Sequence, residues 1–313
     1  MSTRVAVLAG GRSPEREVSL RSGHRVMTAL QSRGHDAIVV DPAEVPLVET
    51  LAVAGVSVCY LALHGKEGED GTVQRLLELM GIPYTGTGAL ACGSTFDKVL
   101  AKEIMAASGV PTPAWAAIEA PALRDLGGGA LLHRIPERVG LPVVVKPSRA
   151  GSAMGLSFVD READLPHAVM SALSFADAVV VEHKIEGVEV AASMLGSPDE
   201  PLPLVEIVPK SGVYDYASRY TAGATEYYAP ARLTPEIAGA CQSVAAQAFL
   251  VLGLRDVSRA DIMVDAAGQP WVVDVNVSPG MTDTSLLPMS AQAAGISFPD
   301  LCERILQLAL AHG

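Results

Sequence analysis

The sequence predicts an α/β fold that changes to an α+β arrangement in its C-terminal part. Three observations support this prediction. Over residues 1–95, short apolar runs alternate with helical patterns, which indicates a parallel sheet with helices on its faces. From Val188 onward, strand-like runs follow one another closely, which is typical of an antiparallel sheet. The chain has 313 residues, more than one average domain contains, so we expect two or three domains.

The elements of the N-terminal part follow from its patterns in order. Apolar runs predict strands at Arg4–Gly11, Ala37–Val40 and Val56–Leu63. Apolar residues at helical spacing predict a helix at Arg16–Ser32 and a second at Gly71–Gly81, where a glycine closes the helix. This order predicts parallel strands, each joined to the next by a helix.

The rest of the chain is predicted in the same way. The three glycines at 127–129 predict a surface loop. The predicted helices are 96–108, 160–173, 234–252 and 297–312, and the predicted strands are 141–148, 152–159, 178–183, 188–195, 202–209, 256–265 and 271–277.

Composition excludes several classes of protein. Hydrophobic residues make up 49% and charged residues 19%, as in globular rather than disordered chains. The net charge of −12 argues against a nucleic acid or an acidic membrane surface as the main partner. The first apolar run is too short for a signal peptide, and no run is long enough to cross a membrane. Four widely spaced cysteines indicate reduced thiols, without a disulfide or zinc site. We therefore expect a cytoplasmic protein.

The sequence SRADIMVDAAGQPWVVDVNVSPG predicts a hairpin with polar residues on one face. A turn at Ala267–Gly268 would pair Val264 with Trp271, and its register is a hypothesis. The pairs nearer the strand ends would be Asp261 with Asp274 and Arg259 with Asn276, and the core-facing residues would be Ile262, Val264, Val273 and Val275. Two aspartates placed opposite each other repel. A cation relieves this repulsion, and Asp and Asn oxygens suit Mg²⁺. The alternative is that both aspartates are solvated on an exposed face.

Two further segments could bind anions. Gly280, in a turn after the hairpin, lets backbone N–H groups approach a ligand, and with Ser285 and Arg259 it could cradle a carboxylate or an oxyanion. Taken alone, that turn could be an ordinary one. Lys146 ends an apolar strand and precedes the small-residue loop at 148–155, which could cradle phosphate. The Walker A spacing is absent.

Several motifs, in this order along the chain, resemble those of the D-alanine–D-alanine ligases, members of the ATP-grasp superfamily. The resemblance covers essentially the whole chain, and the set is far more specific than any one motif. The motifs are GGRSPEREVSL, LHGKEGEDGTVQ, PYTGTG, DKVLAK, VVKPSRAGSAMG, YDYASRY, RADIMVD and DVNVSPGMTDTSLLP.

The resemblance implies a fold, cofactors and partners. It implies an ATP-grasp fold with an N-terminal α/β domain at 1–95, a central domain at 96–185 and a C-terminal domain at 186–313. It implies ATP and two Mg²⁺ ions, with Mn²⁺ as an alternative ion and a monovalent cation as a further candidate. The implied substrates are D-alanine and ATP, the implied product is a peptidoglycan precursor, and the implied assembly is a homodimer formed through the N-terminal domain.

Roles for individual residues also come from the resemblance. Lys98, which alone could be a solvated helix lysine, and Lys146 would contact ATP phosphates. The loop Ser148–Gly155, with Gly151, would close over these phosphates, Glu182 would lie near the adenine, and Glu189 would meet the ribose. Asp261, Asp274 and Asn276 would hold Mg²⁺. Glu15 would bind the ammonium of the first D-alanine with His64 nearby, and Ser152 and Tyr220 would join Glu15 in closing a loop. Arg259, Gly280, Ser285 and Leu286 would surround the second D-alanine and the transition state.

Four positions depart from the family pattern. Asp274 replaces a glutamate, Arg219 replaces a lysine near the phosphate, Ala153 replaces a serine, and His183–Lys184 lacks an aromatic residue. Two alternatives to a D-alanine–D-alanine ligase therefore stay open. One is a related ligase that uses D-serine, D-lactate or another amine as its second substrate, although by resemblance Tyr220 favours a D-amino acid over a D-hydroxy acid. The other is a nucleotide-binding protein without catalysis.

Overall fold

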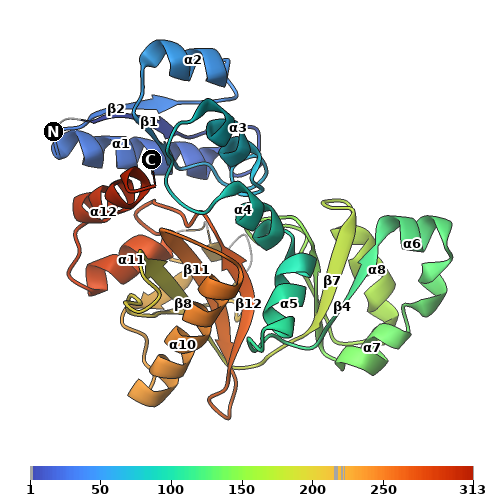
Figure 1. Ribbon diagram of the computed structural model, residues 1–313. Helices are drawn as coiled ribbons and strands as arrows, with labels where there is room; N and C mark the ends of the chain where they lie inside the picture. Colours follow the sequence, from blue (N-terminus) through green and yellow to red (C-terminus); the bar gives the residue numbers. More distant parts are fainter. Residues whose placement is uncertain (1–2, 215–217, 220, 222, 313) are drawn as a thin grey trace.

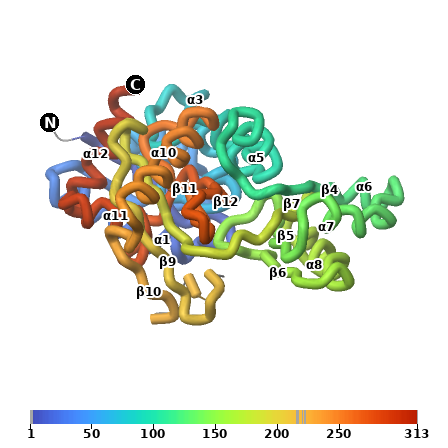
Figure 2. The backbone as a smooth tube through the Cα atoms, turned by 90° about the horizontal axis from the view of Figure 1, so that it is seen from below, coloured from blue at the N-terminus to red at the C-terminus, as the bar shows by residue number. Residues whose placement is uncertain are grey.

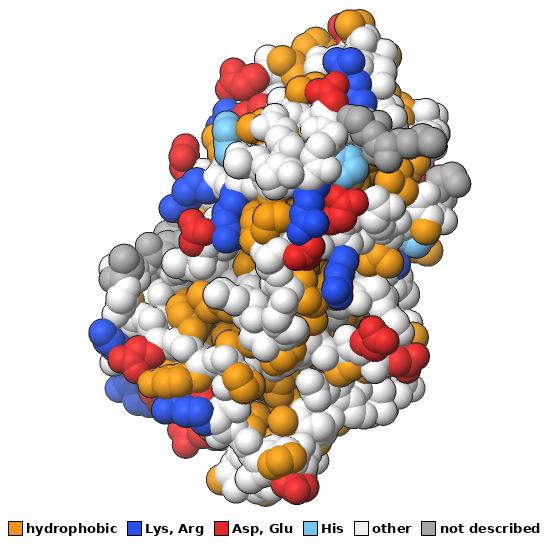
Figure 3. All heavy atoms as spheres, turned by 90° about the vertical axis from the view of Figure 1, so that its left-hand side faces the viewer, with side chains coloured by type: hydrophobic (Ala, Val, Ile, Leu, Met, Phe, Trp, Pro, Cys, Tyr) orange, Lys and Arg blue, Asp and Glu red, His pale blue; other side chains and the backbone are white. Residues whose placement is uncertain are grey.

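The computed structural model of the chain describes residues 3–214, 218–219, 221 and 223–312. Figure 1 shows three groups of elements, with the N-terminal strands and helices at the top left, a middle group at the right and the C-terminal sheet below. In the described part of the chain, no helix is long and apolar enough to cross a membrane. On the face seen in Figure 3, basic side chains lie beside acidic ones.

The N-terminal group is a three-stranded parallel sheet between two layers of helices. The strand order is β2-β1-β3. The helix α1 and the C-terminal helix α12 cover one face, while α2 and α3 share a core with the other. The elements are β1 (Arg4–Leu8), α1 (Arg16–Ser32), β2 (Asp36–Val40), α2 (Leu47–Ala54), β3 (Val58–Leu61), α3 (Thr72–Met80) and α4 (Ala89–Phe96). The predicted parallel sheet is confirmed, and the C-terminal helix completes its core.

The middle group is a four-stranded antiparallel sheet, which extends away from the rest of the chain in Figure 2. The strand order is β4-β7-β5-β6, and α7 and α8 pack against the sheet. The elements are α5 (Lys98–Ala107), β4 (Trp115–Glu119), α6 (Ala120–Asp125), η1 (Gly128–Leu131), α7 (Arg134–Val139), β5 (Val143–Pro147), β6 (Ser157–Val159), η2 (Glu162–Asp164), α8 (Leu165–Ala172) and β7 (Ala178–His183).

The C-terminal group is a five-stranded antiparallel sheet in the order β10-β9-β8-β11-β12. Helix α10 packs on one face, and α11 packs near β8 and β9. The elements are β8 (Val188–Leu195), β9 (Val205–Pro209), β10 (Thr225–Tyr228), α10 (Pro235–Val251), β11 (Val257–Val264), β12 (Pro270–Asn276), α11 (Leu286–Ala293) and α12 (Phe298–Leu310). This sheet confirms the α+β arrangement predicted for the C-terminal part.

Some predicted elements were wrong in extent. The strand predicted at 152–159 covers only Ser157–Val159, because Ser152 and Ala153 have left-handed backbone angles that end extended structure. Part of the glycine segment at 127–129 lies in the short helix η1 rather than in a plain loop. The helix predicted from Phe96 begins at Lys98, where the Asp97 side chain accepts hydrogen bonds from Val99 and Leu100. The elements α2, α4, β4, α6, α7, β10 and α11 were not predicted.

Candidate functional site

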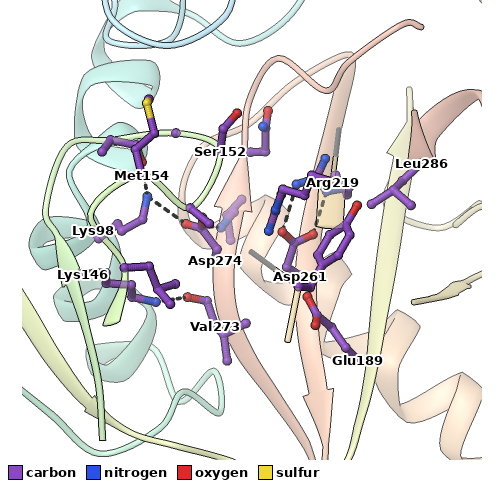
Figure 4. A pocket seen from close by; sticks show the side chains of 18 of the residues that line it. Lys98, Lys146, Ser152, Met154, Glu189, Arg219, Asp261, Val273, Asp274 and Leu286 are labelled. Atoms are coloured by element: carbon purple, nitrogen blue, oxygen red, sulfur yellow. Dashed lines mark hydrogen bonds and ion pairs between the residues drawn. The ribbon is translucent and has the colours of Figure 1, made fainter. Parts of the chain in front are cut away.

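A cavity of about 280 Å³ lies where the three groups of elements meet, a size close to the lower end of ligand pockets, roughly 300–1,000 Å³. Its walls come from α1, α5, β5, the loop after β5, β7, β8, β11, β12 and the turn that follows. Figure 4 shows Lys98 and Lys146 facing Asp274 and Val273 across it, with Asp261, Glu189 and Leu286 farther along. The sequence-predicted residues that line it are Glu15, His64, Lys98, Lys146, Gly151, Ser152, Glu182, Glu189, Arg219, Arg259, Asp261, Asp274, Asn276, Gly280, Ser285 and Leu286.

Two of the predicted residues that the structure describes are not among those lining the cavity. Ser148 is buried at the end of β5, where its backbone carbonyl accepts a hydrogen bond from the Lys98 N–H at 2.9 Å. Gly155 has φ +72° and lies so close to Pro147 and Phe175 that a Cβ would collide with both. These two positions shape the loop rather than line the cavity. Tyr220 lies outside the described residues.

The β11–β12 hairpin brings the predicted polar set together. Asp261 pairs with Asp274 and Arg259 with Asn276, as predicted. The pairing then shifts by one residue, so that Val264 faces Pro270 rather than Trp271. Val273 is the extra residue of this bulge and lines the cavity, so its predicted core position was wrong; Val272 is buried in the core instead.

Each aspartate of the hairpin has a cationic partner. Arg259 donates from Nε and Nη2 to the two oxygens of Asp261 at 2.6 and 2.9 Å, and both residues are buried. Lys98 Nζ lies 3.3 Å from Asp274 Oδ1. Burial acts to raise the pKa of Asp274, but the charges of Lys98 and Lys146 outweigh it and lower this pKa. Asp274 is therefore held ionised, and basic side chains of the protein itself lie against both aspartates and relieve the predicted repulsion.

The oxygens of this hairpin fit a divalent cation in their chemistry. Asp261, Asp274 and Asn276 all line the cavity, and hard oxygen ligands are those that Mg²⁺ prefers. Within residues 3–214 and the described positions after them, no three His, Cys, Asp or Glu side chains form a metal site by themselves. A magnesium ion held here would therefore take the Asn276 amide, water and phosphate oxygens in addition to the two carboxylates.

A buried cluster of two lysines and one glutamate forms the other wall. Glu182 Oε1 accepts from Lys146 Nζ at 2.5 Å, and Glu182 Oε2 lies 2.6 Å from Lys102 Nζ. Lys146 also donates to the Val273 carbonyl at 2.8 Å, and Lys102 to Thr112 Oγ1 at 2.6 Å. Burial acts to raise the pKa of Glu182, but the two lysines outweigh it and lower this pKa. Lys146 and Glu182 line the cavity, whereas Lys102 lies behind them, where burial lowers its pKa.

Lys102 was not singled out from the sequence, although a signal for it was present. It lies four residues after Lys98 in α5, and residues four apart share a face of a helix. The motif DKVLAK therefore contains two lysines aimed in one direction. Only the fold shows that the second one reaches Glu182 of β7.

The loop after β5 closes onto Glu15 at the start of α1. The Ser152 hydroxyl donates a hydrogen bond to Glu15 Oε1, whereas Glu15 Oε2 is buried without a hydrogen-bond partner among the described residues. Burial, followed by the charge of Glu69, raises the pKa of Glu15. A buried carboxylate oxygen that faces a cavity without a partner suits a cationic group of a ligand.

Gly151 offers a direct test of this contact. A Cβ at Gly151 would lie 2.6 Å from Glu15 Oε2, so Gly151→Ala should push the loop away from Glu15. We expect a loss of about tenfold or more in kcat/KM, because a displacement of about 1 Å can cost up to about 100-fold. Steady-state kinetics would measure it. Gly129→Ala, where a Cβ has open space around it, is the matched control and should behave as the wild type.

The turn after β12 forms the far end of the cavity. Ser285 Oγ accepts a hydrogen bond from the Thr282 N–H at 3.0 Å, and a Cβ at Gly280 would lie 2.7 Å from this oxygen. Leu286 begins α11 and is buried. His64 is already engaged, since its Nδ1 lies 3.1 Å from the Ser278 carbonyl and its Nε2 3.2 Å from Ser22 Oγ.

Glu189 and Arg219 lie beside the hairpin. The Arg219 guanidinium stacks 4.3 Å from the centre of the Tyr214 ring. Burial raises the pKa of Glu189 to about 7; Asp261 adds to this rise, while Arg219 and Arg259 oppose it. Glu189 therefore changes its charge near neutral pH, unlike Asp274.

The raised pKa of Glu189 predicts how stability depends on pH. Between pH 4.5 and about 7 the folded protein retains a proton that the unfolded chain releases, so the free energy of unfolding falls as the pH rises through this window. The raised pKa of Glu15 acts in the same direction. We expect the wild type to lose about 1–3 kcal/mol across the window, and Glu189→Gln to lose clearly less. Urea unfolding at both ends of the window measures this, and equal losses in the two proteins would contradict it.

Comparison with known proteins places the whole chain among one group of enzymes. The family description "D-ala D-ala ligase C-terminus" matches residues 104–307, and "D-ala D-ala ligase N-terminus" matches residues 44–87. A D-alanine–D-alanine ligase of Pelotomaculum thermopropionicum is 43% identical over 312 residues, covering 99% of this chain and 98% of the relative. The solved structure of a D-alanine–D-alanine ligase from Bacillus anthracis complexed with ATP has a TM-score of 0.84 and 30% identity, covering 99% of this chain and 98% of that one. A D-Ala:D-Ser ligase from Enterococcus faecalis has the same TM-score at 28% identity, covering 99% and 100%.

Proposed function

Because this chain belongs to the D-alanine–D-alanine ligase family, we propose that it joins two D-alanines into D-alanyl-D-alanine at the expense of ATP. The observation that carries the proposal is the set of side chains that line the cavity described above. It combines a carboxylate and amide set suited to Mg²⁺, a cluster of two lysines around Glu182 and, at Glu15, a carboxylate oxygen that has no hydrogen-bond partner in the described part of the chain. The dipeptide would serve as a precursor of peptidoglycan.

ATP would lie between the lysine cluster and the hairpin. Lys98 and Lys146 would contact its phosphates, under the loop that contains Gly151 and Ser152, while Glu182 and Glu189 would meet the adenine and the ribose. Bound Mg²⁺, or Mn²⁺ in its place, would neutralise phosphate charge. Arg219 would add a cation near the phosphates. Positioning and electrostatic stabilisation supply most of the catalysis in phosphoryl transfer, and these side chains offer both.

The first D-alanine would place its ammonium against Glu15. Its carboxylate would attack the γ-phosphorus of ATP, so that a C–O–P linkage forms, the bond to ADP breaks, and D-alanyl phosphate results. The deprotonated amine of the second D-alanine would then attack the acyl carbon, and phosphate would leave. Arg259 and the Gly280 N–H would stabilise the tetrahedral oxyanion, and Ser285 and Leu286 would border the second D-alanine. Tyr220 would join Ser152 and Glu15 in closing the loop.

One assay tests the proposal. ADP and phosphate release should require ATP, Mg²⁺ and D-alanine together, with D-alanyl-D-alanine identified by mass spectrometry. A second candidate is favoured by the likeness to the D-Ala:D-Ser ligase, so D-serine, D-lactate and other amines belong in the same panel, where one acceptor should dominate in kcat/KM. Tight ATP binding without turnover of any acceptor would instead indicate a protein that has lost catalysis.

Further parts of the proposal concern organisation. We propose domains at 1–95, 96–185 and 186–313, a homodimer formed through the first of them, a cytoplasmic location and a contribution from a monovalent cation. The three separate sheets support the division, although α12 packs on the N-terminal sheet. Measurement of the molar mass in solution and of turnover with and without K⁺ would test the assembly and the ion.

A further inference from the structure

The wall formed by residues 280–285 is supported from behind by helix α1. Gly280, Thr282, Thr284 and Ser285 line the cavity, whereas Met281 is buried in the core that α1 and α12 share. Met281 therefore anchors the segment in the protein core, while the residues on either side of it face the cavity. Its position depends on what holds Met281.

Both polar groups of the Met281 backbone are bound by α1. The Met281 N–H donates to Ser22 Oγ at 3.2 Å, and Arg25 Nη1 donates to the Met281 carbonyl at 2.9 Å. Ser22 and Arg25 are three residues apart, so they lie on one face of the helix.

Arg25 is itself held in a fixed orientation. Its Nε lies 2.9 Å from Asp283 Oδ1, and its guanidinium lies 3.6 Å from the centre of the Phe298 ring in α12. A guanidinium that stacks on an aromatic ring and pairs with a carboxylate loses less freedom per hydrogen bond than a lysine would. Arg25 thus ties residues 281 and 283 to both α1 and α12, and it does so without lining the cavity.

We propose that Arg25 is a positioning residue for the acceptor end of the cavity and helps to select the second substrate. The inference rests on the proposed function. If the Met281 carbonyl is released, the peptide between Met281 and Thr282 can turn, and the Thr282 N–H that now bonds Ser285 Oγ moves with it. Gly280 and Ser285 then lose their fixed geometry, while the lysine cluster on the opposite wall does not.

The test compares two arginines that both contact α12, Arg25 within α1 and Arg33 at its C-terminal cap. Arg25→Met keeps the apolar stem but removes the hydrogen bond, the ion pair and the cation above Phe298. Arg33→Met is the matched control, because Arg33 pairs with Asp300 of α12 and no contact with residues 280–285 is described for it. Each full-length variant is assayed for KM of ATP, KM of the acceptor D-alanine, and the ratio of D-alanyl-D-alanine to D-alanyl-D-serine formed from an equal mixture of D-alanine and D-serine.

For Arg25→Met we expect the acceptor KM to rise by about tenfold, as for the loss of one charge-assisted hydrogen bond, and the product ratio to change, while KM for ATP stays within about twofold of wild type. Asp283→Asn, which keeps the bond to Met281 and the ring contact, should give a smaller change in the same direction. Arg33→Met should match wild type in all three values. The inference would be overturned if Arg25→Met and Arg33→Met had the same acceptor KM and the same product ratio. It would also be overturned if the KM for ATP in Arg25→Met rose as much as the acceptor KM.

A wild-type protein that is inactive with D-alanine would refute the proposed function itself, and the wild-type assay decides this before any variant is made.

Discussion

Asp261→Asn should lower Mg²⁺-dependent turnover on the order of 1,000-fold, the scale of losing a key electrostatic group in a dry site. The substitution keeps the size of the side chain and one hydrogen-bond acceptor for Arg259, but it removes a negative charge that would serve both the cation and Arg259. It leaves the buried guanidinium without its counter-charge, which should cost about 3–5 kcal/mol of stability. Kinetics as a function of Mg²⁺ concentration and urea unfolding measure the two effects separately.

Asp265→Asn is the matched control for this prediction. Asp265 lies at the turn of the same hairpin, where it accepts hydrogen bonds from Trp271 Nε1 and from the backbone N–H groups of Ala267 and Gln269. It does not line the cavity. We therefore expect some loss of stability and nearly full turnover. A folded Asp261→Asn protein with wild-type turnover would refute the assignment of Asp261 to a cation site.

The two lysines that share Glu182 should differ in what they contribute. Lys146 lines the cavity and Lys102 does not, although both contact the same carboxylate. Lys146→Met should lower kcat/KM for ATP by about 100- to 1,000-fold, because a charge that we propose to contact the phosphates is lost. Lys102→Met should act mainly on stability, at about 1–3 kcal/mol, because Glu182 and Thr112 each lose a buried partner. Kinetics and unfolding measured on both variants give the comparison.

The pair of variants contains its own control. Each removes one positive charge from the cluster, so a difference in activity reports the position of the charge rather than the net charge. Equal losses of kcat/KM in the two folded variants would contradict the proposal that, of the two lysines bound to Glu182, only Lys146 contacts the phosphates. A Lys102→Met protein as stable as the wild type would show that Glu182 needs only one lysine.

The local patterns of the chain were sufficient to predict the hairpin that carries the carboxylates. Alternation along two strands and a glycine-containing turn are properties of neighbouring residues, so the pairing of Asp261 with Asp274 and of Arg259 with Asn276 was correct. The bulge that moves Val273 into the cavity was missed. The neighbouring residues in the sequence do not fix where a bulge with one extra residue forms. Its position depends on what the strand packs against, which here is the core under α10 on one side and Lys146 on the other.

The sequence by itself determined most of the longer strands and helices, the parallel and antiparallel halves, and the kinds of side chain available for chemistry, because all of these depend on residues close together in the chain. Only the tertiary structure decided which of these side chains meet. Lys102 reaches Glu182 across 80 positions, and Arg25 holds Met281 across 256. Such contacts depend on how α5 lies against β7, and α1 against the turn after β12. That packing is set by the shared cores, which no short stretch of sequence contains.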